Sequence, residues 1–124
     1  MTYLKKGYLI AIILLASCQT KVQFEQFDAA AWQSDRNGCT GLRTTLLPDL
    51  LLEKDKLTGL NQPSLSRVLG RPDHQELYVR NQKFFVYFID PSEACRDQSG
   101  EEQPRQLHIR FNATGKVNEV SVQY

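Results

Sequence analysis

The chain has 124 residues, of which 41% are hydrophobic and 23% charged, so it has the size and composition of one globular domain. Its formal charge is +1. Residues 1–17 contain two lysines and no acid, and their removal leaves 13 of the 15 basic residues against 14 acidic ones. A nearly neutral chain without a basic cluster lacks the phosphate-neutralising face of a nucleic-acid binder. We therefore expect a single domain that does not bind nucleic acid.

The N-terminus has the order of a secretory signal peptide. Lys5 and Lys6 precede an apolar run from Tyr8 to Ala16. As a helix this run would rise about 14 Å, which is less than half of the ~30 Å hydrocarbon core of a bilayer. This length favours a removable signal peptide over the alternative, an uncleaved membrane-spanning anchor. We expect residues 1–17 to be cleaved off.

The apolar run ends in Leu15-Ala16-Ser17-Cys18, which resembles the lipobox of bacterial lipoproteins. The resemblance implies cleavage before Cys18 and lipid attachment to its thiol, which would anchor the protein to a membrane. Gln19 stands where lipoproteins retained at the inner membrane usually have Asp, and this favours the outer membrane. No acidic run of the surface-export type follows, which favours the periplasmic face. Residues 18–26 would then form a flexible lipidated tether to a domain at 27–124.

Assigning Cys18 to lipid leaves Cys39 and Cys95 as the remaining cysteines in an oxidising compartment. We expect these two residues to form a disulfide. On the loop-entropy model it would stabilise the fold by roughly 4 kcal/mol. The alternative makes Cys39 a nucleophile, but no Cys/His signature surrounds it.

Three helical segments are predicted in the first half of the chain. The segment from Phe27 to Gln33 is a short helical turn with Trp32 as its packing anchor, and a ligand-stacking tryptophan is the alternative. Leucines recur at helical spacing from Gly41 to Lys54, where Pro48 predicts either a kink or a restart. The third segment is a short helix that is capped by Asn61 and ended by Gly70.

The second half alternates between apolar and polar residues, which is typical of half-buried strands. The alternating segments are 76–80, 84–89, 107–112 and 119–124. The first two predict a hairpin that places Val79 opposite Phe84 and Leu77 opposite Val86, with the intervening aromatic residues on the other side of the sheet. Helices followed by an antiparallel meander predict a two-layer α+β domain with a sheet of three to four strands.

Several of these segments together resemble the SmpA/OmlA (BamE-like) family of small outer-membrane lipoproteins. The shared pattern is Leu57 to Asp73 with its Leu-Gly-x-Pro ending, the aromatic strand Phe84–Phe88, and the final hairpin from Leu107. Trp32 to Arg43, which includes Cys39, departs from the better-known members and looks like a branch with an extra disulfide. The resemblance implies a nonenzymatic accessory protein that binds envelope partners, such as the barrel-assembly machinery, or supports envelope integrity. The same layout also resembles secreted β-lactamase-inhibitor proteins, so an inhibitor-like or ligand-sensing module is the alternative.

The sequence contains no nucleophile elbow, metal-ligand doublet or phosphate-binding glycine loop, so we expect no enzymatic activity, cofactor or metal. His74 and His108 are far apart in the chain, and Asp35–Gly38 is better explained as a turn than as a calcium loop. The predicted partner surface combines aromatic residues of the first hairpin with two bases. It consists of Tyr78, Arg80, Lys83, Phe85 and Tyr87. The alternative is that the segment from Phe27 to Trp32 covers this face.

Overall fold

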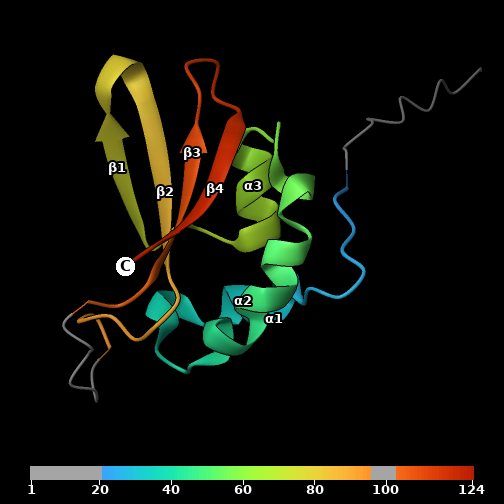
Figure 1. Cartoon of the computed structure of the whole chain (residues 1–124), viewed down its shortest axis with the longest axis vertical. Helices are drawn as coiled ribbons and strands as arrows, with labels where there is room; N and C mark the ends of the chain where they lie inside the picture. Colours follow the sequence, from blue (N-terminus) through green and yellow to red (C-terminus); the bar gives the residue numbers. More distant parts are fainter. Residues whose placement is uncertain (1–20, 96–102) are drawn as a thin grey trace, which may run out of the picture.

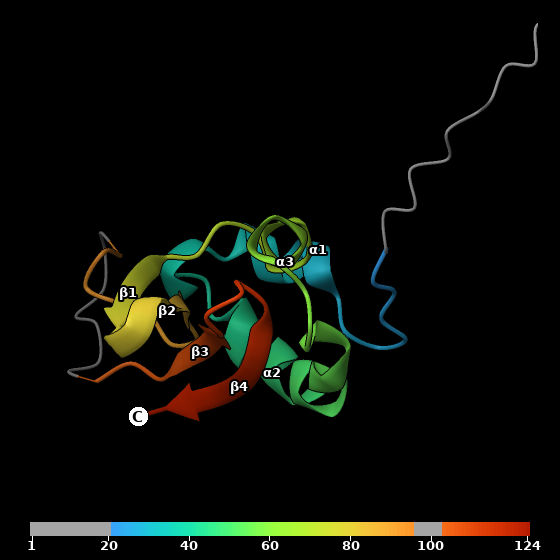
Figure 2. The ribbon, with the colours of Figure 1, turned by 90° about the horizontal axis from the view of Figure 1, so that it is seen from above.

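The computed structural model describes residues 21–95 and 103–124. Three helices, α1 (Ala29–Ser34), α2 (Leu42–Leu52) and α3 (Gln62–Leu69), precede an antiparallel sheet of order β1-β2-β3-β4. Its strands are β1 (His74–Tyr78), β2 (Gln82–Phe88), β3 (Gln106–Phe111) and β4 (Val117–Gln123). Figures 1 and 2 show the helices on one face of the sheet. The predicted α+β fold is thus confirmed.

Helices α1 and α3 both begin at a side-chain cap. Asp28 accepts a hydrogen bond from the Ala31 amide at 3.0 Å, and Asn61 accepts one from the Ser64 amide at 2.9 Å. Helix α3 ends at Gly70, whose φ of 81° lies in the region that glycine adopts without strain. The predicted start and stop of the third helix are therefore confirmed.

Helix α2 continues through Pro48 to its end, so the proline does not divide it into two helices. Leu47 and Leu50 are buried, whereas Leu42 and Leu52 are exposed. Leucines therefore lie on more than one side of this helix, and only part of the predicted stripe faces the core.

The core lies between the helices and the sheet, with Trp32 near its centre. Trp32 is fully buried, and its ring centre lies 5.8 Å from that of Phe27 and 6.4 Å from that of Tyr87. Tyr87 also donates a hydrogen bond to the Gly70 carbonyl at 2.9 Å, and burial raises the pKa of its phenol. The prediction of Trp32 as a packing anchor is confirmed.

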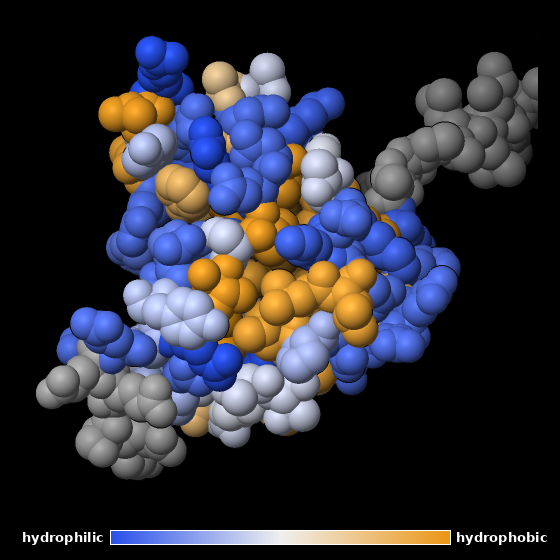
Figure 3. Space-filling view, in the orientation of Figure 1, coloured by the Kyte–Doolittle hydropathy of each residue, from blue (hydrophilic) through white to orange (hydrophobic). Residues whose placement is uncertain are grey.

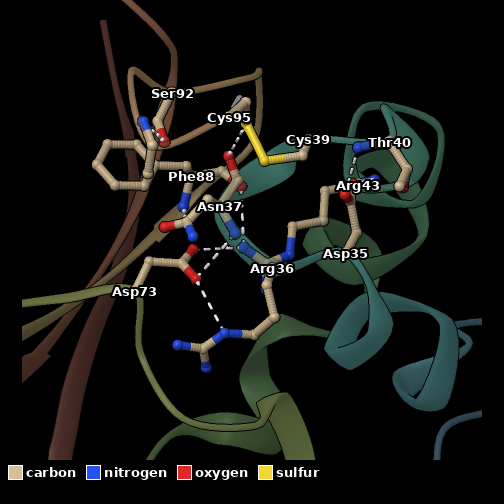
Figure 4. Close-up of a disulfide and its surroundings, with 11 residues drawn as sticks. Asp35, Arg36, Asn37, Cys39, Thr40, Arg43, Asp73, Phe88, Ser92 and Cys95 are labelled. Carbon is tan, nitrogen blue, oxygen red and sulfur yellow. Dashed lines mark hydrogen bonds and ion pairs between the residues drawn. A yellow bond between two sulfur atoms is a disulfide. The ribbon is translucent and has the colours of Figure 1, made fainter. Parts of the chain in front are cut away.

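A disulfide joins Cys39, near the helical layer, to Cys95 in the segment that follows β2 (Figure 4). The two Cα atoms are 5.4 Å apart. The Ser92 amide donates a hydrogen bond to the Asn37 carbonyl at 3.2 Å, so backbone contacts support the same junction. The predicted pairing is confirmed. Cys18, the predicted lipid site, lies outside the described residues.

A buried ion pair lies next to this disulfide. The side chains of Arg43 and Asp73 are both fully buried, and Arg43 Nη1 lies 2.5 Å from Asp73 Oδ2. Arg43 also donates to the carbonyls of Trp32 at 3.1 Å and Phe88 at 3.0 Å. The Asp73 carboxylate accepts the Phe88 amide at 2.9 Å. These bonds connect α2 with the segment before β1 and with the end of β2.

Candidate protein-binding surface

The first hairpin pairs in a register that differs from the predicted one. Tyr78 lies opposite Gln82 and Leu77 lies opposite Lys83, which is a shift of three residues from the predicted pairs. The chain turns through Val79–Asn81, and the last two residues of this loop have φ values of 62° and 61°. A shift by an odd number of residues moves the side chains of one strand to the other face of the sheet. The predicted register is therefore wrong.

This register also makes the predicted partner surface wrong at two positions. Phe85 and Tyr87 face the helical layer and are only 4% and 0% exposed, because both belong to the core cluster that contains Phe27 and Trp32, and Trp32 contacts Tyr87 directly. The alternative, in which residues from Phe27 to Trp32 cover this face, is the one observed. Tyr78 lies on the opposite face, where its ring centre is 5.7 Å from that of Phe84.

The hairpin has a different exposed surface, which we call the hairpin surface. It consists of the exposed residues Leu77, Tyr78, Val79 and Arg80, together with Lys83, which is half-buried. The three apolar or aromatic members are 83%, 55% and 66% exposed in chain order. Figure 3 shows apolar atoms at the upper left, over this hairpin, beside strongly hydrophilic ones. Neither base forms an ion pair with another residue in the described part of the chain.

The hairpin surface lies at an edge of the sheet. Among the described residues β1 pairs only with β2, and all five of its residues are exposed, because the strand extends beyond the helical layer (Figures 1 and 2). An edge strand has backbone N–H and C=O groups on its outer side that can pair with another chain. Proteins use such edges to bind extended segments of their partners by strand addition. An apolar edge next to two bases is therefore suited to protein recognition.

Figure 3 also shows a larger apolar area between α2 and β4. Leu46 and Leu51 of α2 and Val120 and Val122 of β4 are partly buried and pack against the core. This area is continuous with the core, whereas none of the helices in the described part of the chain backs the hairpin surface.

The two histidines lie on the sheet face away from the helices. His74 and His108 both pair with Val86, from the strands on either side of it, so they share this face. Burial lowers the pKa of His108, which favours the neutral imidazole. Among residues 21–95 and 103–124, no three His, Cys, Asp or Glu side chains gather as metal ligands.

Part of the predicted tether is bound to the domain, which the sequence pattern did not indicate. From Gln23 onward, its backbone contacts Glu53 and Lys56 at the end of the helical layer. The interpretation of 18–26 as a flexible chain is therefore wrong for residues 23–26. These contacts join residues distant in sequence, so no local pattern could reveal them.

Comparison with protein-family models, curated proteins and solved structures gave no match. Within the described ranges, no helix has the length and apolar character needed to cross a membrane.

Proposed function

We propose that this chain is a nonenzymatic lipoprotein, anchored through Cys18 to the periplasmic face of the outer membrane, that binds another envelope protein through the hairpin surface. The lipobox-like motif supports the anchor. The resemblance to SmpA/OmlA proteins supports a role in outer-membrane protein assembly or envelope integrity. The exposed apolar edge at Leu77, Tyr78 and Val79 carries the proposal of protein binding.

The position of the hairpin surface is compatible with this function. The described chain starts at residue 21 beside the helices, and β1 lies on the opposite side of the domain (Figures 1 and 2). A membrane anchor near residue 21 would therefore leave the hairpin surface accessible to a partner.

In-cell photocrosslinking of the full-length protein tests the partner. A photoreactive phenylalanine analogue at Tyr78 should crosslink to a subunit of the barrel-assembly machinery, identified by mass spectrometry. The same analogue at exposed Thr58 should give none of this product. Crosslinking only to a soluble secreted enzyme would favour the inhibitor-like alternative, and equal yields from both positions would contradict the proposed surface.

Substitution of the exposed apolar residues tests whether they provide the binding energy. We expect the combined change of Leu77, Tyr78 and Val79 to Ser to abolish copurification of the partner while circular dichroism remains unchanged, because these side chains contribute little to the core. If this variant copurified the partner at the wild-type level, the proposal would be contradicted.

The anchor has a separate test. A Cys18→Ala protein should lose lipid labelling and appear in the soluble periplasmic fraction. A variant that remains lipid-labelled and membrane-bound would overturn the assignment.

A further inference from the structure

Glu53 binds the backbone of the N-terminal segment. Glu53 is the residue that follows α2, and its side chain is only 11% exposed. Its carboxylate accepts three consecutive backbone amides, those of Glu25 at 2.6 Å, Gln26 at 3.2 Å and Phe27 at 2.9 Å. Hydrogen bonds to an ionised carboxylate are about twice as strong as neutral ones.

Lys56, in the 3-10 helix η2 (Lys54–Leu57), strengthens this arrangement from the other side. Its Nζ donates to Glu53 Oε1 at 3.0 Å and to the Gln23 carbonyl at 2.8 Å. Phe24 lies in the sequence between the anchored residues Gln23 and Glu25, and its ring also contacts this site. Its centre is 5.0 Å from the Phe27 ring centre and 5.9 Å from the Lys56 ammonium. Both charges of the Glu53–Lys56 pair thus bind the same short segment.

We infer that Glu53 is a positioning residue that fastens residues 23–27 to the domain and so shortens the length of chain available between Cys18 and the domain. This inference rests on the proposed lipidation of Cys18 for its membrane consequence, whereas the fastening itself is independent of lipid. Five extended residues span at most about 18 Å, compared with about 32 Å for the nine residues of 18–26. Glu53 therefore keeps this end of the domain close to the bilayer.

The fastening also orients the domain. With the link attached beside α2 and η2, the hairpin surface lies on the side away from the anchored end (Figure 1). A freely jointed tether of nine residues would allow the domain to rotate and bring any face to the lipid. The fastened segment restricts this rotation and keeps the hairpin surface directed away from the membrane.

Amide hydrogen exchange tests the fastening in the mature full-length protein. In Glu53→Ala, the amides of residues 25–27 should exchange at least about tenfold faster than in the wild type, while the β2 and β3 amides keep their protection. Asp55→Ala is the matched control, because Asp55 is an exposed acid in η2, two residues after Glu53, and its loss should change neither set. Unchanged protection of residues 25–27 in Glu53→Ala would overturn the inference.

Paramagnetic broadening tests the orientation. The lipidated protein is placed in nanodiscs of phosphatidylethanolamine and phosphatidylglycerol that contain a gadolinium-chelating lipid. Amides of residues 21–27 and 54–57 should broaden, and those of 77–81 should not. In Glu53→Ala, residues 77–81 should broaden as well. Uniform broadening in the wild type would overturn the orientation.

These outcomes are distinguishable from failure of the proposed function. If intact mass shows no lipid on Cys18, the anchor is wrong, and the exchange experiment still decides the fastening. If crosslinking finds no partner while residues 25–27 remain protected by Glu53, only the proposed binding activity is overturned.

The fastening should persist in mild acid. The Glu25 amide, with those of Phe27 and Gln26 and the Lys56 ammonium, lowers the pKa of Glu53 from 4.5 to about 2. Because the folded pKa is depressed, the stabilisation is complete above about pH 4.5 and is lost as the pH falls towards 2. The amide chemical shifts of residues 25–27 should therefore titrate near pH 2. A midpoint near 4.5 would contradict the expected ionisation.

Discussion

Arg43 illustrates the demands on a single buried charge. Its guanidinium packs against both the Trp32 and Tyr87 rings, 5.0 and 5.7 Å from their centres, and forms an ion pair with Asp73. One nitrogen, Nη2, has no hydrogen-bond partner among the described residues. Burial of a charge is costly unless it is paired, so Arg43 and Asp73 depend on each other.

We predict that Arg43→Ala lowers the free energy of unfolding by about 3–5 kcal/mol, because it removes the buried cation that pairs with the buried Asp73 carboxylate. Arg36→Ala is the control. Arg36 lies 3.8 Å from the same carboxylate, but its side chain is 50% exposed, and its loss should cost less than about 1 kcal/mol. Urea unfolding of the oxidised proteins measures both values. Equal losses of unfolding free energy in the two variants would show that the buried ion pair stabilises the fold no more than the exposed Arg36 contact.

At the scale of elements, close backbone approach joins the helical layer to the end of β2. Gly38 lies in the 3-10 helix η1 (Arg36–Gly38) with φ of 70°. A Cβ added at Gly38 would lie 2.6 Å from the Asp90 carbonyl oxygen. Asp90 is held in turn by Arg105, whose hydrogen bonds lower the pKa of the Asp90 carboxyl. The backbone at Gly38 and the backbone at Asp90 are therefore held close together.

We predict that Gly38→Ala is more destabilising than Gly59→Ala. Both glycines have positive φ, so alanine costs about 1–2 kcal/mol at either position. A Cβ at Gly59 meets nothing within 4 Å, whereas at Gly38 the overlap with Asp90 should add about 1–3 kcal/mol. Urea denaturation curves give the comparison. Similar denaturation midpoints for the two variants would mean that the segment after β2 shifts at little energetic cost to make room for the added Cβ.

At the scale of the whole molecule, the disulfide links Cys39, near the helical layer, to the segment that follows β2. Cys39 and Cys95 are separated by 56 positions in the sequence. A cross-link over a loop of this length restricts the unfolded chain strongly.

We predict that the double change Cys39→Ala and Cys95→Ala lowers the free energy of unfolding by about 4 kcal/mol on the loop-entropy model. Guanidinium unfolding of the double variant and of the oxidised wild type measures the difference. A loss below about 1 kcal/mol would show that the Arg43–Asp73 pair and the core hold this junction without the covalent link.

The sequence by itself determined the features that depend on near neighbours or on counting. The cap at Asn61 and the stop at Gly70 bound α3, because a side-chain cap and a left-handed glycine act within one helical turn. The change from helical to alternating periodicity established the α+β class. The expected lipidation of Cys18 predicted that Cys39 and Cys95 pair with each other, and the structure confirms this pair.

Only the tertiary structure decided the register of the first hairpin and, with it, the candidate site. Positive φ at Arg80 and Asn81 sets that register, and neither residue type demands such a conformation. The register sends Phe85 and Tyr87 into the core and leaves Tyr78 exposed. Alternation shows that two faces differ, but not which face the helices cover.

The binding partners of two charged residues, Arg43 and Glu53, could not be predicted from the sequence either. Arg43 meets Asp73 across 30 positions, and Glu53 meets the amides of residues 25–27 across 26 to 28 positions. A local sequence pattern relates only residues that lie within a few helical turns of each other. Contacts over such separations form when the layers pack, because packing brings each charge to the partner that compensates its desolvation.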